Sequence, residues 1–183
     1  MLEKFSMAET IIGDNIILVK RDHDYDAEMH ETIENNRRFL RKFLFWVDKE
    51  HTLKDAIAAT DRFLDGWEKG EKFAYIIADK HSEKLLGCID IHSISLSNHT
   101  AEIGYWLRKD KTGFGYMTEA VKLIEKEAFS HGIRRLEICC DAHNKASCAV
   151  AVRCGYEHEA TLKEALSCYS EFHDKEIYVK FNR

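Results

Sequence analysis

The chain has 183 residues, of which 45% are hydrophobic and 32% are charged, and its formal net charge is −5 at pH 7. This composition excludes a disordered chain and is sufficient for one domain with a substantial core. The net negative charge argues against a protein that binds nucleic acid directly.

Other bulk features narrow the class of protein further. No run reaches the ~18 apolar residues of a membrane span, and residues 1–6 lack the apolar core of a signal peptide. The six cysteines contain no C-x-x-C pair, and the ten histidines contain no H-x-x-x-H or H-E-x-x-H motif. We therefore expect a cytoplasmic protein with reduced cysteines in its core, no disulfide framework and no zinc site.

The N-terminal part is predicted to begin with a strand over residues 15–19 and then to be mainly helical. A first helix is expected over residues 24–35. Residues 52–69 give the clearest helical signal, because Thr52 can cap the N-terminus, apolar residues recur at three and four spacing, and Gly70 ends the pattern.

The segment between these helices, residues 37–46, mixes four cations with six large apolar residues. One interpretation is a helical or turn-rich piece with one packed face and one solvated face. The alternative is one wall of a groove that receives an acidic or peptide-like partner.

The pattern then changes to strands over residues 73–78, 85–93 and 101–108, joined by short polar turns, which predicts an antiparallel meander. The third strand has two distinct faces because side chains alternate. Neither face is wholly polar, which is expected for a sheet covered on both sides. One face carries Ala101, Ile103, Tyr105 and Leu107, and the other carries Glu102, Gly104, Trp106 and Arg108.

A loop with Gly113 and Gly115 follows this strand and leads into a helix over residues 119–130. A strand, a glycine-bearing loop and a helix start gather unpaired N–H groups at the positive end of a helix dipole, where an anion can bind. The alternative is an ordinary strand-to-helix turn, since the loop matches neither a Rossmann fingerprint nor a Walker A motif. A strand over residues 134–141 completes a strand–helix–strand unit, whose strands should be parallel neighbours.

The C-terminal part is predicted to contain a short helix capped by Asn144 and ended by Gly155. A strand over residues 156–162, a turn over 171–174 and a closing strand over 175–181 should follow.

This order of elements resembles the GCN5-related N-acetyltransferase (GNAT) superfamily over nearly the whole chain. The resemblance implies an α+β GNAT fold in a single domain, residues 1–183, with a mixed central sheet of about seven strands and helices on both faces. Three segments look like the ribosomal-protein alanine/serine acetyltransferase branch, whose members acetylate N-terminal α-amines. They are Thr100-Ala-Glu-Ile-Gly-Tyr-Trp-Leu107, Gly113-x-Gly-Tyr-Met-Thr-Glu-Ala120 and Asp141-x-x-Asn144-x-x-Ser147.

The resemblance implies acetyl-CoA as co-substrate, with no need for a metal. Its pyrophosphate would lie on backbone amides of the glycine loop, and its pantetheine arm would pair with the backbone of the preceding strand, where that strand splays from its neighbour. An N–H there could also stabilise the tetrahedral oxyanion. The residues expected to hold acetyl-CoA are Trp106, Leu107, Arg108, Lys111, Thr112, Gly113, Phe114, Gly115, Tyr116, Met117, Thr118, Asn144 and Ser147.

Two residues are candidates for the proton transfers. Ser147 would protonate the departing CoA thiolate, and its alternative is a plain serine in the first turn of a helix. Glu102 would be the base, through water, and its alternative is a structural carboxylate paired with a nearby cation. His92, His143 and Glu171 are weaker candidates for the base.

Several positions depart from the family pattern. Asp110 stands where the superfamily has Gln or Arg, and we expect its carboxylate to point away from the pyrophosphate. Ala151 stands where many members carry a tyrosine acid, which leaves that role to Ser147. Leu166 stands where some members carry a glutamate base. Arg153 could meet a CoA phosphate or simply end its helix favourably.

Three functions remain open from the sequence. The first is acetylation of the N-terminus of a ribosomal protein, which predicts an open groove between residues 37–46 and residues 167–174. The second is acetylation of a small amine such as a polyamine, an amino acid or an antibiotic, which predicts a closed pocket. The third is a non-catalytic module that binds CoA. No membrane partner is expected, and the oligomeric state, homo-oligomer or monomer, is left open.

Overall fold

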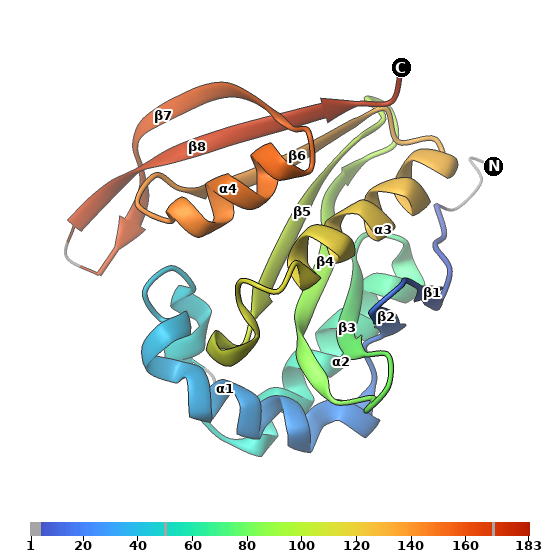
Figure 1. The fold of residues 1–183 in the computed structure, drawn as a ribbon, viewed down its shortest axis with the longest axis vertical. Helices are drawn as coiled ribbons and strands as arrows, with labels where there is room; N and C mark the ends of the chain where they lie inside the picture. The colour runs from blue at the N-terminus through green and yellow to red at the C-terminus, as the bar shows by residue number, and fades with distance from the viewer. Residues whose placement is uncertain (1–4, 50, 170) are drawn as a thin grey trace.

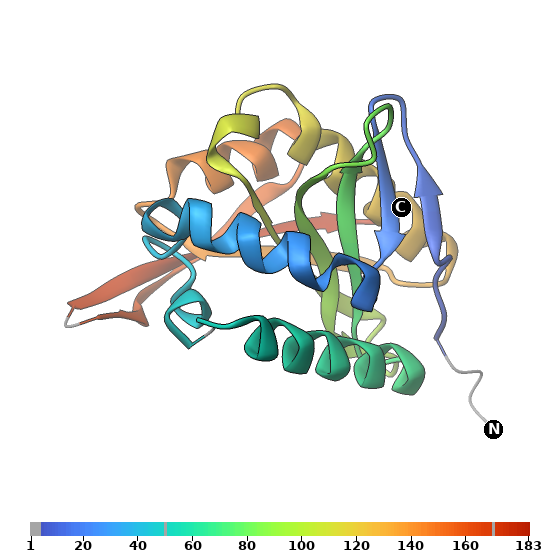
Figure 2. The ribbon, with the colours of Figure 1, turned by 90° about the horizontal axis from the view of Figure 1, so that it is seen from below.

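The computed structural model describes residues 5–49, 51–169 and 171–183. Within these residues eight strands form one mixed sheet in the order β1-β2-β3-β4-β5-β6-β8-β7. Helices α1 and α2 cover one face of the sheet, and α3 and α4 cover the other (Figures 1 and 2). The expected α+β fold with helices on both faces is therefore confirmed. The eighth strand is β1, which extends the predicted first strand into a hairpin with β2.

The bounds of the elements follow the predicted order along the chain. The strands are β1 Thr10–Ile12, β2 Ile16–Lys20, β3 Phe73–Asp79, β4 Leu85–Ser95, β5 Thr100–Leu107, β6 Arg135–Asp141, β7 Glu157–Cys168 and β8 Glu171–Phe181. The helices are α1 Asp26–Leu40, α2 Leu53–Lys69, α3 Tyr116–Ser130 and α4 Lys145–Arg153, and short 3-10 turns lie at His23–Tyr25, Phe45–Lys49 and Lys109–Lys111. No helix in the described part of the chain is both long and apolar enough to cross a membrane.

The core lies on both faces of the antiparallel meander β3–β4–β5. The larger cluster packs one face of the sheet against α3 and α4, and it includes the three apolar residues Ala101, Ile103 and Leu107 of β5. The smaller cluster packs the other face against α1, with Trp106 at its edge. The two faces predicted for β5 are thus both covered.

The parallel pairing of β5 with β6 is short. It runs from Thr100 opposite Arg135 to Glu102 opposite Glu137. Beyond Glu102, β5 keeps its antiparallel partner β4, and β6 keeps its antiparallel partner β8. The two strands therefore splay apart in the middle of the sheet, as expected, and their facing peptide groups are left without a neighbouring strand.

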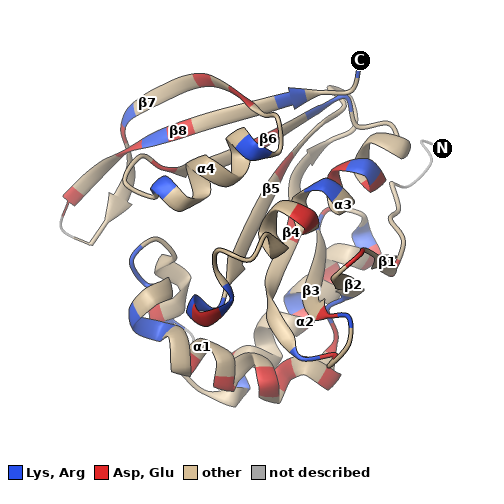
Figure 3. Cartoon of the chain, in the orientation of Figure 1, with Lys and Arg blue, Asp and Glu red and all other residues tan. Residues whose placement is uncertain are grey.

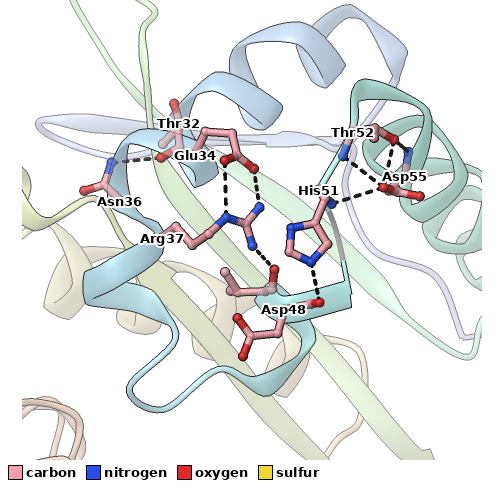
Figure 4. Close-up of polar contacts among 9 residues, drawn as sticks. Thr32, Glu34, Asn36, Arg37, Asp48, His51, Thr52 and Asp55 are labelled. Carbon is pink, nitrogen blue, oxygen red and sulfur yellow. Dashed lines mark hydrogen bonds and ion pairs between the residues drawn. The ribbon is translucent and has the colours of Figure 1, made fainter.

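Helix α1 runs five residues beyond its predicted end at residue 35, so the start of segment 37–46 is helical. The Arg37 guanidinium pairs with Glu34 one turn earlier and donates to the carbonyl of Val47 (Figure 4). An ion pair at this spacing favours helix, and the bond to Val47 fixes the turn that follows.

Helix α2 begins as predicted at Thr52. Thr52 and Asp55 form a capping box, in which each side chain accepts a hydrogen bond from the other's backbone amide (Figure 4). Gly70 ends the helix in the left-handed conformation with φ 73°. These local signals were sufficient to place both ends of this helix from the sequence.

The C-terminal hairpin is longer than predicted. The predicted turn over residues 171–174 is wrong, because these residues begin β8 and pair with the end of β7. Most side chains of β7 are exposed, so polar residues are tolerated on a strand at this edge of the sheet. Of the predicted groove wall 167–174, residue 170 lies outside the described residues.

Candidate active site

A large cleft opens where β5 leaves β6. Its volume is about 1310 Å³, and it lies between β5, the loop before α3, α4 and the end of α1. Every predicted cofactor residue except Arg108 lines this cleft. The fold therefore brings together residues from the two segments 106–118 and 144–147, and their contact with acetyl-CoA stays a prediction.

The two glycines of the loop are required by backbone conformation. Gly113 and Gly115 both have φ +88°, and a Cβ added at either would meet nothing within 4 Å. Gly115 is the N-cap of α3, and among the described residues no side chain caps that helix end. The first amides of α3 are thus open toward the cleft, which is the geometry of an anion site.

Basic side chains line the cleft beside this helix end and further along α3. Lys111, Lys122, Lys126 and Arg153 all line the cleft. Figure 3 shows basic residues along α3 and at the ends of α4. Together with the open amides, these cations make this end of the cleft suited to a ligand with several negative charges.

The loop is anchored at its start by α1. The amide of Lys109 donates to Asn36 Oδ1 over 2.8 Å, and the Asn36 side-chain nitrogen donates to the carbonyl of Thr32. Asn36 therefore fixes the point where the loop leaves β5. The rest of the loop connects this anchor to the start of α3.

Arg108 and Asp110 form a pair outside the cleft. The guanidinium donates from Nε and Nη2 to the two oxygens of Asp110 over 3.0 and 3.1 Å. Neither residue lines the cleft, so the Asp110 carboxylate points away from it, as expected, while the placement of Arg108 differs from prediction.

The orientation of the β5 peptides refines which of them can pair with a ligand. The amide of Arg108 donates to the Leu86 carbonyl of β4. Because peptide groups alternate in direction along a strand, those of Tyr105 and Leu107 point to the opposite side, into the gap beside β6. Leu107 was predicted as a backbone contact, and Tyr105 was not.

Ser147 lies in the first turn of α4, and its amide donates to Asn144 Oδ1 over 3.2 Å. The predicted cap at Asn144 is therefore confirmed. The hydroxyl oxygens of Ser147 and Tyr105 lie 3.0 Å apart. Sequence reasoning missed Tyr105 because its place among apolar residues of β5 marked it as a core aromatic. Burial raises the pKa of Tyr105 above its ordinary value, so its phenol stays protonated.

A smaller pocket of about 190 Å³ adjoins the large cleft at Phe43, on the face of β5 that carries Glu102. It is lined by the aromatic residues that follow α1, by the ends of β6 and β7, and by two charged residues of opposite sign on β5 and β8. The lining residues are Phe43, Phe45, Glu102, Cys139, Cys140, Asp141, Leu166 and Lys175. Glu102 thus does not line the large cleft but faces this second pocket.

Glu102 belongs to a chain of charged groups. Its Oε1 lies 3.7 Å from His92 Nε2, and His92 Nδ1 lies 2.6 Å from Asp90 Oδ1. Burial alone would lower the pKa of His92, but hydrogen bonds to Asp90 and Glu102 outweigh it and raise the pKa to about 9. For Glu102 the signs are reversed, because burial alone would raise its pKa. The hydrogen bond and charge of His92 and the charge of Lys175 outweigh burial and lower that pKa. Glu102 is therefore ionised at neutral pH.

The other two weaker candidates for the base, His143 and Glu171, lie beside the small pocket without lining it. His143 and Glu171 belong to a cluster with Asp141 and His173 at the end of β6, where Asp141 contacts both histidines. Leu166 lines the small pocket, so the position that carries a glutamate in some family members contributes no carboxylate here.

The family follows from the sequence match. The model of the acetyltransferase (GNAT) domain matches residues 15–157, which is well over half of the chain. The chain belongs to the GNAT acetyltransferase family. The glycine loop, the splayed strand and the Asn-capped helix all lie within or beside the matched range.

Individual relatives agree with this family. The ribosomal-protein-serine acetyltransferase of Escherichia coli is 28% identical over 176 residues, covering 95% of this chain and 97% of that protein. The microcin C7 self-immunity acetyltransferase MccE, solved in complex with acetyl-CoA and AMP, is 28% identical with a TM-score of 0.89, covering 97% of this chain and 99% of its own. The ribosomal L7/L12 α-N-protein acetyltransferase RimL, solved with CoA, shares the fold at 24% identity and a TM-score of 0.90, covering 94% and 98%.

Replacing Gly113 with aspartate should raise the dissociation constant of acetyl-CoA at least about tenfold, or ~1.4 kcal/mol. The new carboxylate would oppose an anionic ligand at the start of α3. Gly132→Asp is the matched control, because Gly132 has φ +93° and equally open space but lies beyond the far end of α3. Isothermal titration calorimetry checks both variants, and equal affinities would remove the loop from the site.

Replacing His92 with glutamine should remove a pH-dependent part of stability. The folded-state pKa of about 9 exceeds the unfolded value of 6.5, so this contribution is complete below pH 6.5 and is lost as the pH rises to about 9. Urea unfolding of wild type should show a loss of ~1–3 kcal/mol over this interval relative to His92→Gln. The control His81→Gln, at an exposed position, should keep the wild-type profile; a His92→Gln profile that also matched wild type would contradict the ion pair.

Proposed function

We propose that this acetyltransferase transfers the acetyl group of acetyl-CoA to the N-terminal α-amine of a ribosomal protein, in the cytoplasm, by direct attack in a ternary complex. The observation that carries the proposal is the placement of two adjoining pockets beside β5, one large and lined by four cations at the glycine loop, α3 and α4, the other small and containing an ionised carboxylate. The name of the Escherichia coli relative supports the class of acceptor.

The large cleft fits acetyl-CoA. The open amides at Gly115 and the start of α3, with Lys111 and Arg153, would hold the phosphates. The peptide groups of Tyr105 and Leu107 would pair with the pantetheine arm as an added strand would. Acetyl-CoA supplies the activated acyl group, and the chain supplies the position in which an amine can reach it.

The small pocket fits an acceptor of limited size. Its volume of about 190 Å³ is below the ~300–1,000 Å³ of sites for drug-sized molecules. The Tyr169 hydroxyl donates to Asp48 over 2.8 Å and accepts from Arg41 Nε over 3.1 Å, which joins the β7–β8 hairpin to the segment after α1. The open groove expected for a protein substrate is therefore bridged, and a chain end can enter where an internal segment cannot.

The bridge also supports a second candidate function. A covered pocket is what acetylation of a small amine predicts, so a compact amine or free amino acid is the alternative acceptor. A bulky antibiotic is disfavoured by the same volume.

The chemistry requires a neutral acceptor amine. At pH 7 deprotonation costs roughly 1 kcal/mol for an α-amine, with a pKa near 8, and about 4–5 kcal/mol for a lysine, with a pKa near 10.4. Glu102 has a lowered pKa, so it is a modest base that suits the α-amine. Through water, Glu102 would accept the proton that the amine loses as the new N–C bond forms.

The groups that would act on the leaving CoA thiolate lie on the face of β5 that carries Tyr105. Ser147 would donate its hydroxyl proton to the CoA thiolate as the C–S bond breaks, and the neighbouring phenol of Tyr105 would supply hydrogen bonding to the serine oxygen. A peptide N–H of β5 in the gap would stabilise the tetrahedral oxyanion.

The acceptor class is tested by release of CoA from acetyl-CoA. The acceptors are a peptide with the free N-terminus of a ribosomal protein, the same peptide with a blocked N-terminus and an internal lysine, and spermidine. We expect turnover with the first and little with the second. Faster turnover on spermidine than on the free peptide would favour the second candidate, and no release with any acceptor would overturn the proposal.

Replacing Ser147 with alanine should lower kcat by ~10²–10⁴-fold, the usual contribution of a positioned acid, with little change in the dissociation constant of acetyl-CoA. Ser130→Ala is the control, because Ser130 closes α3 at the end away from the glycine loop, where its hydroxyl donates to the carbonyl of Glu127 and lies 3.2 Å from His131 Nδ1. Steady-state kinetics and calorimetry separate the two effects. Wild-type kcat in Ser147→Ala would reduce Ser147 to a first-turn helix serine.

A further inference from the structure

A cluster of two histidines and one carboxylate lies beside the small pocket and has no part in the proposed chemistry. Asp141 is the last residue of β6, His143 lies in the turn before α4, and His173 lies on β8. Asp141 and His143 are two positions apart and His173 lies thirty positions further on, so they match no short metal-binding sequence motif. The fold alone brings them together.

The backbone fixes where these three side chains start. Asp141 lies opposite Lys175 in the antiparallel β6–β8 ladder, and the amide of Ala142 donates to the Asp174 carbonyl, which continues the ladder by one step. By this register His143 falls opposite His173. Their ring centroids are 4.4 Å apart, so the two imidazoles meet at the end of a rigid strand pair.

The ring nitrogens converge on one buried carboxylate. Asp141 is only 5% exposed. Its Oδ1 lies 3.2 Å from His143 Nδ1, and its Oδ2 lies 2.5 Å from His173 Nδ1. One ligand atom from each of the three residues lies within 4.8 Å of the other two, a spacing that one metal ion can bridge.

A second carboxylate, that of Glu171, contacts the far side of the His173 ring. Glu171 Oε2 lies 3.5 Å from His173 Nε2, the ring nitrogen that faces away from Asp141. Histidines that ligate metals usually donate their other ring N–H to a carboxylate or carbonyl, which fixes the tautomer that presents the ligating nitrogen. The cluster therefore has both a set of ligands and an outer partner.

We propose that Asp141, His143 and His173 bind one divalent transition-metal ion, of which Zn²⁺ is the representative. Two imidazole nitrogens and one carboxylate oxygen form a donor set suited to Zn²⁺, Co²⁺ or Ni²⁺ rather than to Mg²⁺ or Ca²⁺, which prefer all-oxygen sites. The side chain of His143 is 67% exposed, so solvent can reach the metal and complete its coordination.

Such an ion would tie β8 to the turn before α4. The same turn leads directly to Asn144 and Ser147, and Asp141 also lines the small pocket. The site would therefore stiffen the wall between the two pockets. This inference goes beyond the proposed function and is independent of it, since metal binding is measured without acetyl-CoA or acceptor.

The test is a titration of the full chain with ZnCl₂ in a non-chelating buffer after treatment with a chelator. Wild type should bind one Zn²⁺ per chain with a rise in melting temperature, and MgCl₂ should give neither. His173→Asn and His143→Asn should each weaken binding by at least about tenfold, the lower end of the loss seen when even an outer partner is removed. His143→Asn keeps the experiment decisive if His173→Asn does not fold, because His143 is largely exposed.

His158→Asn is the matched control. His158 lies on the same hairpin and also pairs with a carboxylate, Glu176, over 2.6 Å, but with no second histidine beside it in the described residues. The His158→Asn variant should bind Zn²⁺ with the same affinity as wild type. The near-ultraviolet spectrum of bound Co²⁺ should lack charge-transfer bands from thiolate. Absence of saturable one-to-one binding, equal affinity in all variants, or thiolate bands would each overturn the proposal.

Discussion

The active-site geometry depends on the end of one strand pairing. β5 and β6 share only three residue pairs in the described part of the chain. The sheet remains continuous because β5 pairs with β4 and β6 pairs with β8 over most of their lengths. In the described part of the chain no strand pairs with the β5 peptide groups that face the gap, and unpaired backbone groups are costly unless water or a ligand satisfies them. A ligand with an amide-bearing arm is therefore favoured at this place.

The glycine loop converts this gap into a site with a defined charge. Left-handed φ at Gly113 and Gly115 lets the chain reverse from β5 into α3 while its amides turn toward the cleft. The anchor from Lys109 to Asn36 holds the start of the loop against α1. Arg108 then neutralises Asp110 outside the cleft, which explains how an acidic residue is tolerated in a loop suited to an anion.

The sequence predicted those features whose signals are local. Thr52, Gly70 and Asn144 marked helix ends correctly, and alternation along β5 assigned its two faces, because caps and strand periodicity involve residues a few positions apart. It did not predict contacts set by register. Two such contacts are the approach of Tyr105 to Ser147 and the bridge from Tyr169 to Arg41, which join segments far apart in the sequence. The length of β7 depends on its pairing with β8, and the irregularities in that pairing are not encoded in any short sequence pattern.

The alternation of β5 would also separate the two proposed proton transfers in space. Glu102 and Tyr105 differ by an odd number of positions, so their side chains emerge on opposite faces of the strand, and Ser147 follows Tyr105. An ionised carboxylate beside the leaving thiolate would raise the energy of that second negative charge. With Glu102 held by His92 on one face and the hydroxyl pair on the other, each group would keep the protonation state that its proposed step requires, and the reacting carbon would lie between them.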